Sequence, residues 1–304
     1  MSGTDARTSG IVVVGLGRAG KARVRDLKQK VLGENAVLRG VISRRKVEDD
    51  LPTLDWDEAL SREDVNALII CTENDTHEQY ARKALEHGKH VLVDYPLCLS
   101  AQGGKDLFNL AESKGLICHV ENIALLLPAH QDFKKTIKTK DLSLKEGTAR
   151  LEASFASEWF NDINRAGFPS FSGVSTLECL TDLFGSLTLK EAHFVHETDR
   201  HVLTCKLFTS ENRPLTWKIE RLRECTARKR FQEFIFEDGT VLTLPPPGPP
   251  PQPTPGHKGL FARDLELFLA KVRGECSKEI IAEHKKLVLD CLELAEEIKK
   301  MTGF

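Results

Sequence analysis

The sequence lacks the features that mark membrane-spanning, secreted and metal-bound proteins. No window approaches the ~20 apolar residues of a membrane helix, and the stretch MSGTDARTSG has neither an apolar core nor a secretory cleavage pattern. Its eight cysteines include no C-x-x-C pair, which favours reduced, mostly buried thiols over disulfides or a zinc cage. His284 and Cys291 fit no common zinc spacing, and we predict no metal site. We expect a cytoplasmic protein.

The chain also has little net charge of either sign. Its 43 basic and 45 acidic side chains give a formal net charge of -2, so no bulk attraction to nucleic acid or an anionic membrane is expected. With 304 residues, 40% hydrophobic and 29% charged, the chain has a globular composition and enough length for two domains. We expect a monomer that acts on a small molecule.

A glycine-rich turn follows the first apolar run. Residues 11–14 form a β-branched stretch typical of a buried parallel strand, and GLGRAG follows directly at residues 15–20. In this G-x-G-x-x-G spacing, Gly15 permits the tight turn, Gly17 leaves room for a pyrophosphate and Gly20 lets the next helix approach the strand. The motif predicts a dinucleotide-binding Rossmann domain. A purely steric strand-to-helix turn is the alternative.

The end of the second predicted strand distinguishes NAD from NADP. An NAD-specific fold usually carries Asp or Glu there, whereas this chain has Ser43, Arg44 and Arg45. A hydroxyl and guanidinium groups can bind a 2′-phosphate that a carboxylate would repel, so we predict a preference for NADPH over NADH. A solvated basic loop is the alternative.

Strand and helix patterns alternate over residues 1–123 and predict a doubly wound parallel sheet, the NADPH-binding domain. Ligands of such sheets bind outside the carboxyl ends of the strands, so the segments after the third and fourth strands should line the nicotinamide half of the site. The predicted cofactor-binding residues are Gly15, Gly17, Arg18, Ala19, Gly20, Ser43, Arg44, Arg45, Cys71, Glu73, Asn74, His77, Asp94 and Tyr95.

From about residue 124 the pattern changes to longer alternating strands. We predict a C-terminal α+β domain over residues 124–304, with a large, mostly antiparallel sheet, a hairpin turn at EDGT (237–240) and helices near 258–273 and 278–300. The run PPPGPPPQPTPG favours an exposed connector, with an SH3-type docking site as the alternative.

Several motifs resemble a known superfamily. GLGRAG with DTHEQYARKALEHGKHVLVDYP is similar to the glucose-fructose oxidoreductases and inositol dehydrogenases. VISRR, GKHVLVDYPLCLS and GFPSFSGVSTLECLTDLFG more closely resemble the biliverdin reductases, and this resemblance covers nearly the whole chain. It implies an NADPH-dependent enzyme of heme catabolism that transfers hydride to the central C10 methine bridge of biliverdin and yields bilirubin.

The chain departs from the sugar-oxidising members of the superfamily. Those enzymes use the lysine of Glu-Lys-Pro and a later histidine for proton transfer, whereas this chain has Asp94-Tyr95-Pro96, and Ser175 and Glu178 in the later motif. Alcohol oxidation needs a base for the hydroxyl proton, so these departures disfavour a sugar, polyol or diol dehydrogenase. That dehydrogenase and a non-enzymatic NADPH-binding scaffold are the alternatives.

The resemblance also implies residue roles. Tyr95 matches the tyrosine of the family's E-Y-P motif beside the nicotinamide and the tetrapyrrole, and Arg165 matches an arginine close to the pigment. We predict both as catalytic residues. Because arginine keeps its proton, Arg165 should stabilise negative charge and order a proton donor.

Further positions are left open by the sequence. Arg18, Arg44 and Arg165 are all candidates to bind the substrate's propionates. Glu121 is present, but Ala124 stands where a further glutamate is common in the resembled family. Whether Glu121 is an acid or a hydrogen-bonded residue at a strand end is undecided.

Overall fold

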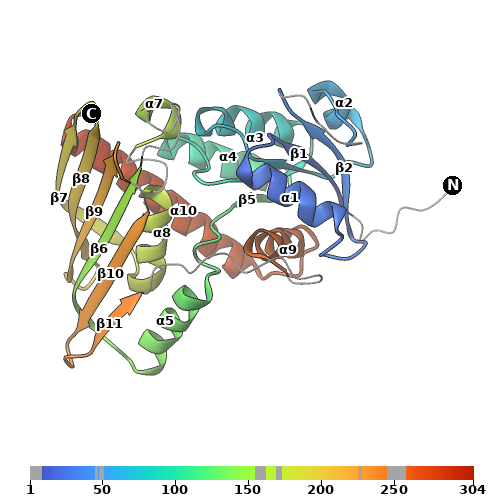
Figure 1. The fold of residues 1–304 in the computed structure, drawn as a ribbon. Helices are drawn as coiled ribbons and strands as arrows, with labels where there is room; N and C mark the ends of the chain where they lie inside the picture. The colour runs from blue at the N-terminus through green and yellow to red at the C-terminus, as the bar shows by residue number, and fades with distance from the viewer. Residues whose placement is uncertain are drawn as a thin grey trace. The chain divides into compact units, whose positions relative to one another are not determined.

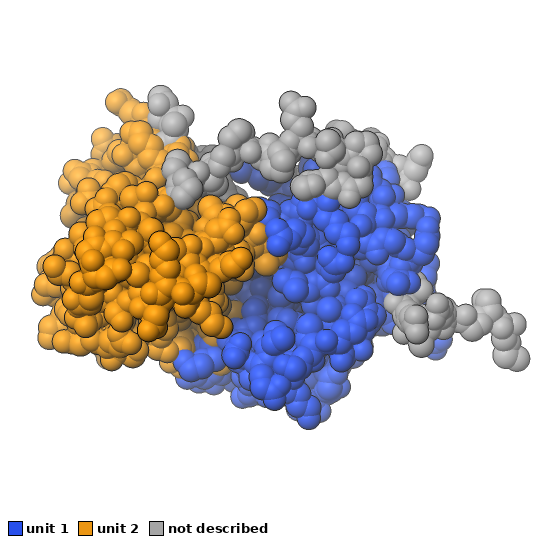
Figure 2. Space-filling view, turned by 90° about the horizontal axis from the view of Figure 1, so that it is seen from below, with its two compact units in different colours: residues 1–123, 251–286 blue, residues 124–250, 287–304 orange. Residues whose placement is uncertain are grey.

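The computed structural model describes residues 9–44, 47, 51–154, 162–168, 173–225, 228–244 and 258–304. The chain divides into two compact units (Figure 2), one of residues 1–123 and 251–286 and the other of residues 124–250 and 287–304. Arg45 and the proline run at 245–256 lie outside the described residues.

The first unit is built on a parallel sheet. Its five strands have the order β2-β1-β3-β4-β5, which confirms the predicted Rossmann architecture (Figure 1). The strands are β1 (Ser9–Val14), β2 (Ala36–Ile42), β3 (Ala67–Ile70), β4 (His90–Val93) and β5 (Cys118–Val120). The intervening helices are α1 (Arg18–Lys28), α2 (Trp56–Ser61), the short 3₁₀ helix η1 (Asn74–Thr76), α3 (His77–Glu86) and α4 (Ala101–Ser113).

A helix from late in the sequence belongs to this first unit. The prediction assigned all of residues 124–304 to the second domain, whereas α9 (Leu260–Val272) groups with residues 1–123. Its Leu265 and Phe268 are fully buried in the same core as Ile11 of β1 and Val24 of α1. This apolar burial holds α9 on the face of the sheet that α1 covers.

The second unit contains a six-stranded sheet of order β11-β10-β6-β9-β8-β7. Only β6 and β9 pair in parallel among its described strands, so the predicted mostly antiparallel sheet is confirmed. The strands are β6 (Leu144–Ser154), β7 (Leu187–His196), β8 (Arg200–Thr209), β9 (Pro214–Leu222), β10 (Lys229–Phe236) and β11 (Val241–Leu244). The predicted turn joins β10 to β11.

Helices cover one face of this sheet. They are α5 (Pro128–Thr139), α7 (Ile163–Ala166), α8 (Gly173–Phe184) and the later part of α10 (Lys278–Thr302). Phe133, Leu177 and Ile298 from three of them pack in the same core as Trp217 and Phe234 of the sheet. The sequence analysis does not predict α5 and α8, although Pro128 at a helix start is a helix signal.

Among the described helices of both units, none combines the length and the apolar composition of a membrane-spanning helix.

Candidate functional site

The glycine-rich turn has the geometry that a dinucleotide requires. Gly15 has φ 89°, and a Cβ there would lie 2.5 Å from the carbonyl oxygen of Cys71. A Cβ at Gly20 would run into the Gly15 carbonyl oxygen, so this glycine allows α1 to pack close to β1. At Gly17 the nearest atom to such a Cβ is 3.9 Å away, which leaves an open cradle directly before α1. The turn therefore fits a pyrophosphate at the helix N-terminus.

Arg44 lies beside this turn at the carboxyl end of β2. Its side chain is 82% exposed, and its guanidinium is 3.3 Å from a Glu73 carboxylate oxygen in the segment after β3. Ser43 is half-buried, and Arg18 is exposed on the first residue of α1. The structure thus brings Arg44 and Glu73 together and leaves the guanidinium open to an anion.

His77 is buried, unlike the exposed Arg18 and Arg44. It is completely buried, with Nδ1 2.8 Å from the Pro96 carbonyl oxygen and Nε2 3.1 Å from that of Thr72. Burial lowers the pKa of His77, and this effect outweighs the two carbonyl hydrogen bonds, which act to raise it. His77 therefore joins the segments that follow β3 and β4. Neighbouring Asn74 is 2% exposed and starts η1.

Two carboxyl groups lie at the ends of β4 and β5: Asp94 is half-buried with its Oδ1 atom enclosed, and Glu121 is 2% exposed. Burial raises the pKa of Asp94 to about 6, an effect that the Arg23 charge and a hydrogen bond with Cys71 oppose. Burial, with the charges of Asp94 and Asp264, raises the pKa of Glu121 to about 8. The Ile123 N–H donates to Glu121 Oε1 at 2.7 Å. Glu121 can consequently carry a proton near neutral pH.

A buried network that the sequence did not reveal surrounds these carboxyl groups. Arg23 donates to the carboxylate of Asp264 and to the carbonyl oxygen of Phe261. His119 Nε2 lies 3.0 Å from Asp264 Oδ1, and Lys271 Nζ donates to His119 Nδ1 at 2.9 Å. The partners are 145 to 241 residues apart in sequence, so no local pattern could have identified them.

His284 extends this network and does not form a metal site with Cys291. Its ring stacks on that of His119 at 4.7 Å, and its Nε2 donates to the Val120 carbonyl oxygen at 3.0 Å. Cys291 lies 3.6 Å from the Thr181 hydroxyl in the second unit. No three metal-ligating side chains converge within the described ranges.

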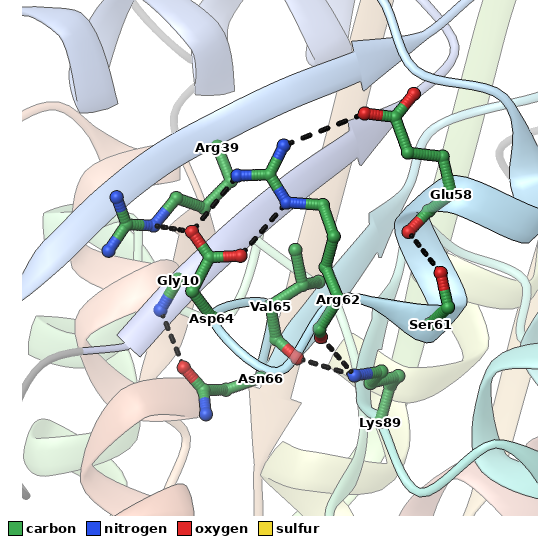
Figure 3. A network of polar contacts seen from close by, with 9 residues as sticks. All are labelled: Gly10, Arg39, Glu58, Ser61, Arg62, Asp64, Val65, Asn66 and Lys89. Atoms are coloured by element: carbon green, nitrogen blue, oxygen red, sulfur yellow. Dashed lines mark hydrogen bonds and ion pairs between the residues drawn. The ribbon is translucent and has the colours of Figure 1, made fainter. Parts of the chain in front are cut away.

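A second polar network lies at the opposite, amino-terminal ends of the strands (Figure 3). Asp64 accepts two hydrogen bonds from Arg62, both of 2.9 Å, and is 3.2 Å from Arg39 Nε. Lys89 donates to the carbonyl oxygens of Arg62 and Val65 at 2.8 Å each (Figure 3). These contacts join the segments that precede β3 and β4. They lie at the opposite edge of the sheet from the glycine-rich turn, which follows the carboxyl end of β1.

The two predicted catalytic residues occur in different units. Tyr95 is half-buried directly after Asp94, at the end of β4. Arg165 is half-buried on α7, where the Asp162 side chain accepts from the Asn164 N–H at 3.0 Å. Phe168, just after α7, is 9% exposed in the core of the second unit. Local capping and apolar burial therefore position Arg165.

Comparisons with known families agree with these features. A model described as an oxidoreductase family with an NAD-binding Rossmann fold matches residues 9–122, and one described as biliverdin reductase, catalytic, matches residues 130–248. The parallel sheet and the open glycine cradle fit the first description. The chain is an NAD(P)-dependent oxidoreductase.

Full-length relatives give the family. The chain is 36% identical to biliverdin reductase A of Mus musculus and 37% identical to that of Homo sapiens, each over 99% of this chain and 98% of the relative. The chain belongs to the biliverdin reductase A family. A solved biliverdin reductase from Synechocystis sp. PCC 6803, in complex with biliverdin and NADP+, has the same fold, with a TM-score of 0.78 at 20% identity over 97% of this chain and 99% of that one.

Proposed function

We propose that this chain is a biliverdin reductase that uses NADPH to reduce the C10 methine bridge of biliverdin, giving bilirubin. Similarity to two biliverdin reductases A over 99% of the chain carries this proposal. The open cradle at Gly17 supports it independently, because a pyrophosphate needs close approach to backbone N–H groups. Tyr95 in place of the superfamily's lysine argues against alcohol oxidation.

The chain's own residues account for cofactor binding. A bound nicotinamide cofactor supplies the hydride. The Gly17 cradle and the first N–H groups of α1 would hold its pyrophosphate. Ser43 and the open guanidinium of Arg44 bind a 2′-phosphate, with Glu73 holding Arg44 at the end of β2. This arrangement favours NADPH over NADH.

On the substrate side we assign Tyr95 and Arg165. Arg165 remains positively charged at neutral pH and stabilises negative charge that develops on the tetrapyrrole. Tyr95 would orient the pigment for hydride transfer. Glu121, whose buried carboxyl has a pKa raised to about 8, holds a proton at the end of β5. Asp94 acts as its neighbour and not as a reacting group.

The first test mixes the purified protein with biliverdin and either NADPH or NADH and follows the pigment's absorbance. We expect the biliverdin band to be replaced by that of bilirubin, faster with NADPH. An unchanged spectrum in the presence of bound NADPH would exclude the reductase.

Substitutions then test the two substrate-side residues. Tyr95→Phe and Arg165→Ala should each lower kcat by about 10- to 100-fold, because each removes a polar group that acts on the pigment in the transition state. NADPH affinity should stay unchanged in Arg165→Ala. Full steady-state activity in either variant would remove that residue from the mechanism.

A further inference from the structure

A pocket in the second unit lies between the helix-covered face of its sheet and α8. Its described lining comes from the start of the unit (Ala124, Leu127, His130), from β6 (Ala149, Arg150, Leu151), from α8 (Ser175, Thr176, Cys179), and from β10 and β11 (Arg230, Gln232, Leu244). Among these described residues are two arginines and no carboxylate. About 460 Å³ is free of protein atoms there, part of it open to solvent.

Strand register shows which arginine faces into this pocket. Arg230 of β10 pairs directly with Leu151 of β6, and Gln232 pairs with Ala149. Directly paired residues share a face of the sheet, and Leu151 and Ala149 belong to the buried core. Arg230 therefore projects from the helix-covered face. Arg150 is exposed and pairs with the exposed Phe231, which places its side chain on the opposite face.

Arg230 has no compensating partner in the part of the chain that the structure describes. Among the described residues, no hydrogen bond or ion pair joins its half-buried guanidinium to a carboxylate. Asp182 of α8 is already bound by His130 Nε2 at 2.8 Å and by Lys134 Nζ at 2.6 Å. Glu178, also on α8, is buried and does not line the pocket. The pocket thus offers a positive charge within a described lining of mixed apolar and polar residues that includes no carboxylate.

We propose that Arg230 binds a propionate carboxylate of the substrate in this pocket and so determines specificity for the free acid. This inference rests on the proposed function for the identity of the carboxylate. A propionate is a carboxylate on a short apolar arm, which matches a guanidinium beside Leu127, Leu151 and Leu244. The three arginines that the sequence suggested for this role do not line the pocket.

The test compares biliverdin with its dimethyl ester, which lacks both negative charges. Arg230→Gln should raise KM for biliverdin by about 10- to 100-fold, because a charge-assisted bond is lost. The KM for the ester should not change. Arg230→Lys should recover part of the loss, since it keeps the charge without the guanidinium fork.

Lys229→Gln is the matched control. It removes the same charge from the neighbouring position, where Lys229 is 69% exposed and pairs with Glu152. Its KM for both pigments should equal that of the unsubstituted protein. Equal melting temperatures and NADPH affinities in the two glutamine variants would show that Arg230→Gln is folded.

Binding measured by pigment absorbance in the presence of NADP+ separates the two proposals. If the protein binds biliverdin more tightly than the ester only when Arg230 is present, but turns neither over, the reductase fails and the carboxylate site stands. If biliverdin is reduced and Arg230→Gln discriminates acid from ester as well as the unsubstituted protein does, the carboxylate site is overturned.

Discussion

Asp94 and Glu121 illustrate how single residues acquire unusual properties at the carboxyl ends of β4 and β5. Burial raises the pKa of both, to about 6 and about 8, above the ordinary values of 3.8 and 4.5. The folded state therefore binds these protons more tightly than the unfolded state does. The resulting stabilisation is complete below the ordinary values and is lost as pH rises through the raised ones.

Glu121→Gln should make stability less dependent on pH. Between about pH 4.5 and pH 8 the free energy of unfolding of the original protein should decrease, whereas the variant should lose less because its amide does not ionise. The melting temperature of the variant, relative to that of the original protein at the same pH, should therefore increase with pH. Glu34→Gln, on the surface beside Lys30, is the control and should leave the pH profile unchanged. An equally steep decrease in Glu121→Gln would contradict the assignment.

At the scale of elements, α9 is attached to the first unit by a buried charge pair as well as by apolar packing. Arg23 of α1 is not exposed at all, and its partner Asp264 of α9 is 2% exposed. Although burial opposes ionisation, the His119 and Arg23 contacts hold the pKa of Asp264 at about 2. The pair stays ionised over the physiological range.

Asp264→Asn should be strongly destabilising because it leaves Arg23 charged and buried. We expect a loss of about 3–5 kcal/mol in the free energy of unfolding. Asp64→Asn is the matched comparison: Asp64 is bound by Arg62 and Arg39, but its side chain is 35% exposed. It should cost about 0–1 kcal/mol. Urea unfolding measures both, and equal losses would refute a special role for the α9 contact.

At the scale of the whole molecule, cofactor binding should be visible as added stability. A ligand that binds only the folded state stabilises it by about 2.7 kcal/mol at 100 times its dissociation constant. NADPH should therefore raise the melting temperature more than NADH does at the same concentration. We expect the difference to come from the bonds that the proposed site at Ser43 and Arg44 makes with the 2′-phosphate.

Arg44→Gln should remove most of this difference between NADPH and NADH, because only the Ser43 hydroxyl of the proposed pair then remains. Arg82→Gln is the control, since Arg82 is also a surface arginine of the first unit, 3.1 Å from the Glu78 carboxylate. It should keep the full preference for NADPH. A preference that survives in Arg44→Gln would assign the 2′-phosphate to other residues.

The sequence alone determined the features that depend on neighbouring residues. The order of strands and helices in residues 1–123 follows from periodicity, and the glycine-rich turn follows from local steric needs at Gly15 and Gly20. The family could also be recognised from the sequence, because its motifs, such as VDYP and GFPSF, are short continuous stretches that need no tertiary contacts to be identified. The predicted roles of Tyr95 and Arg165 rest on those motifs and stay predictions.

Only the tertiary structure decided what depends on contacts between distant residues. The placement of α9 with the first unit comes from packing and from the Arg23–Asp264 pair, whose partners are 241 residues apart. The face on which Arg230 lies depends on its register with Leu151. A shift of one residue would turn that arginine to the other face without changing the strand's own sequence. Such pairings are set by the whole core, which no single segment encodes.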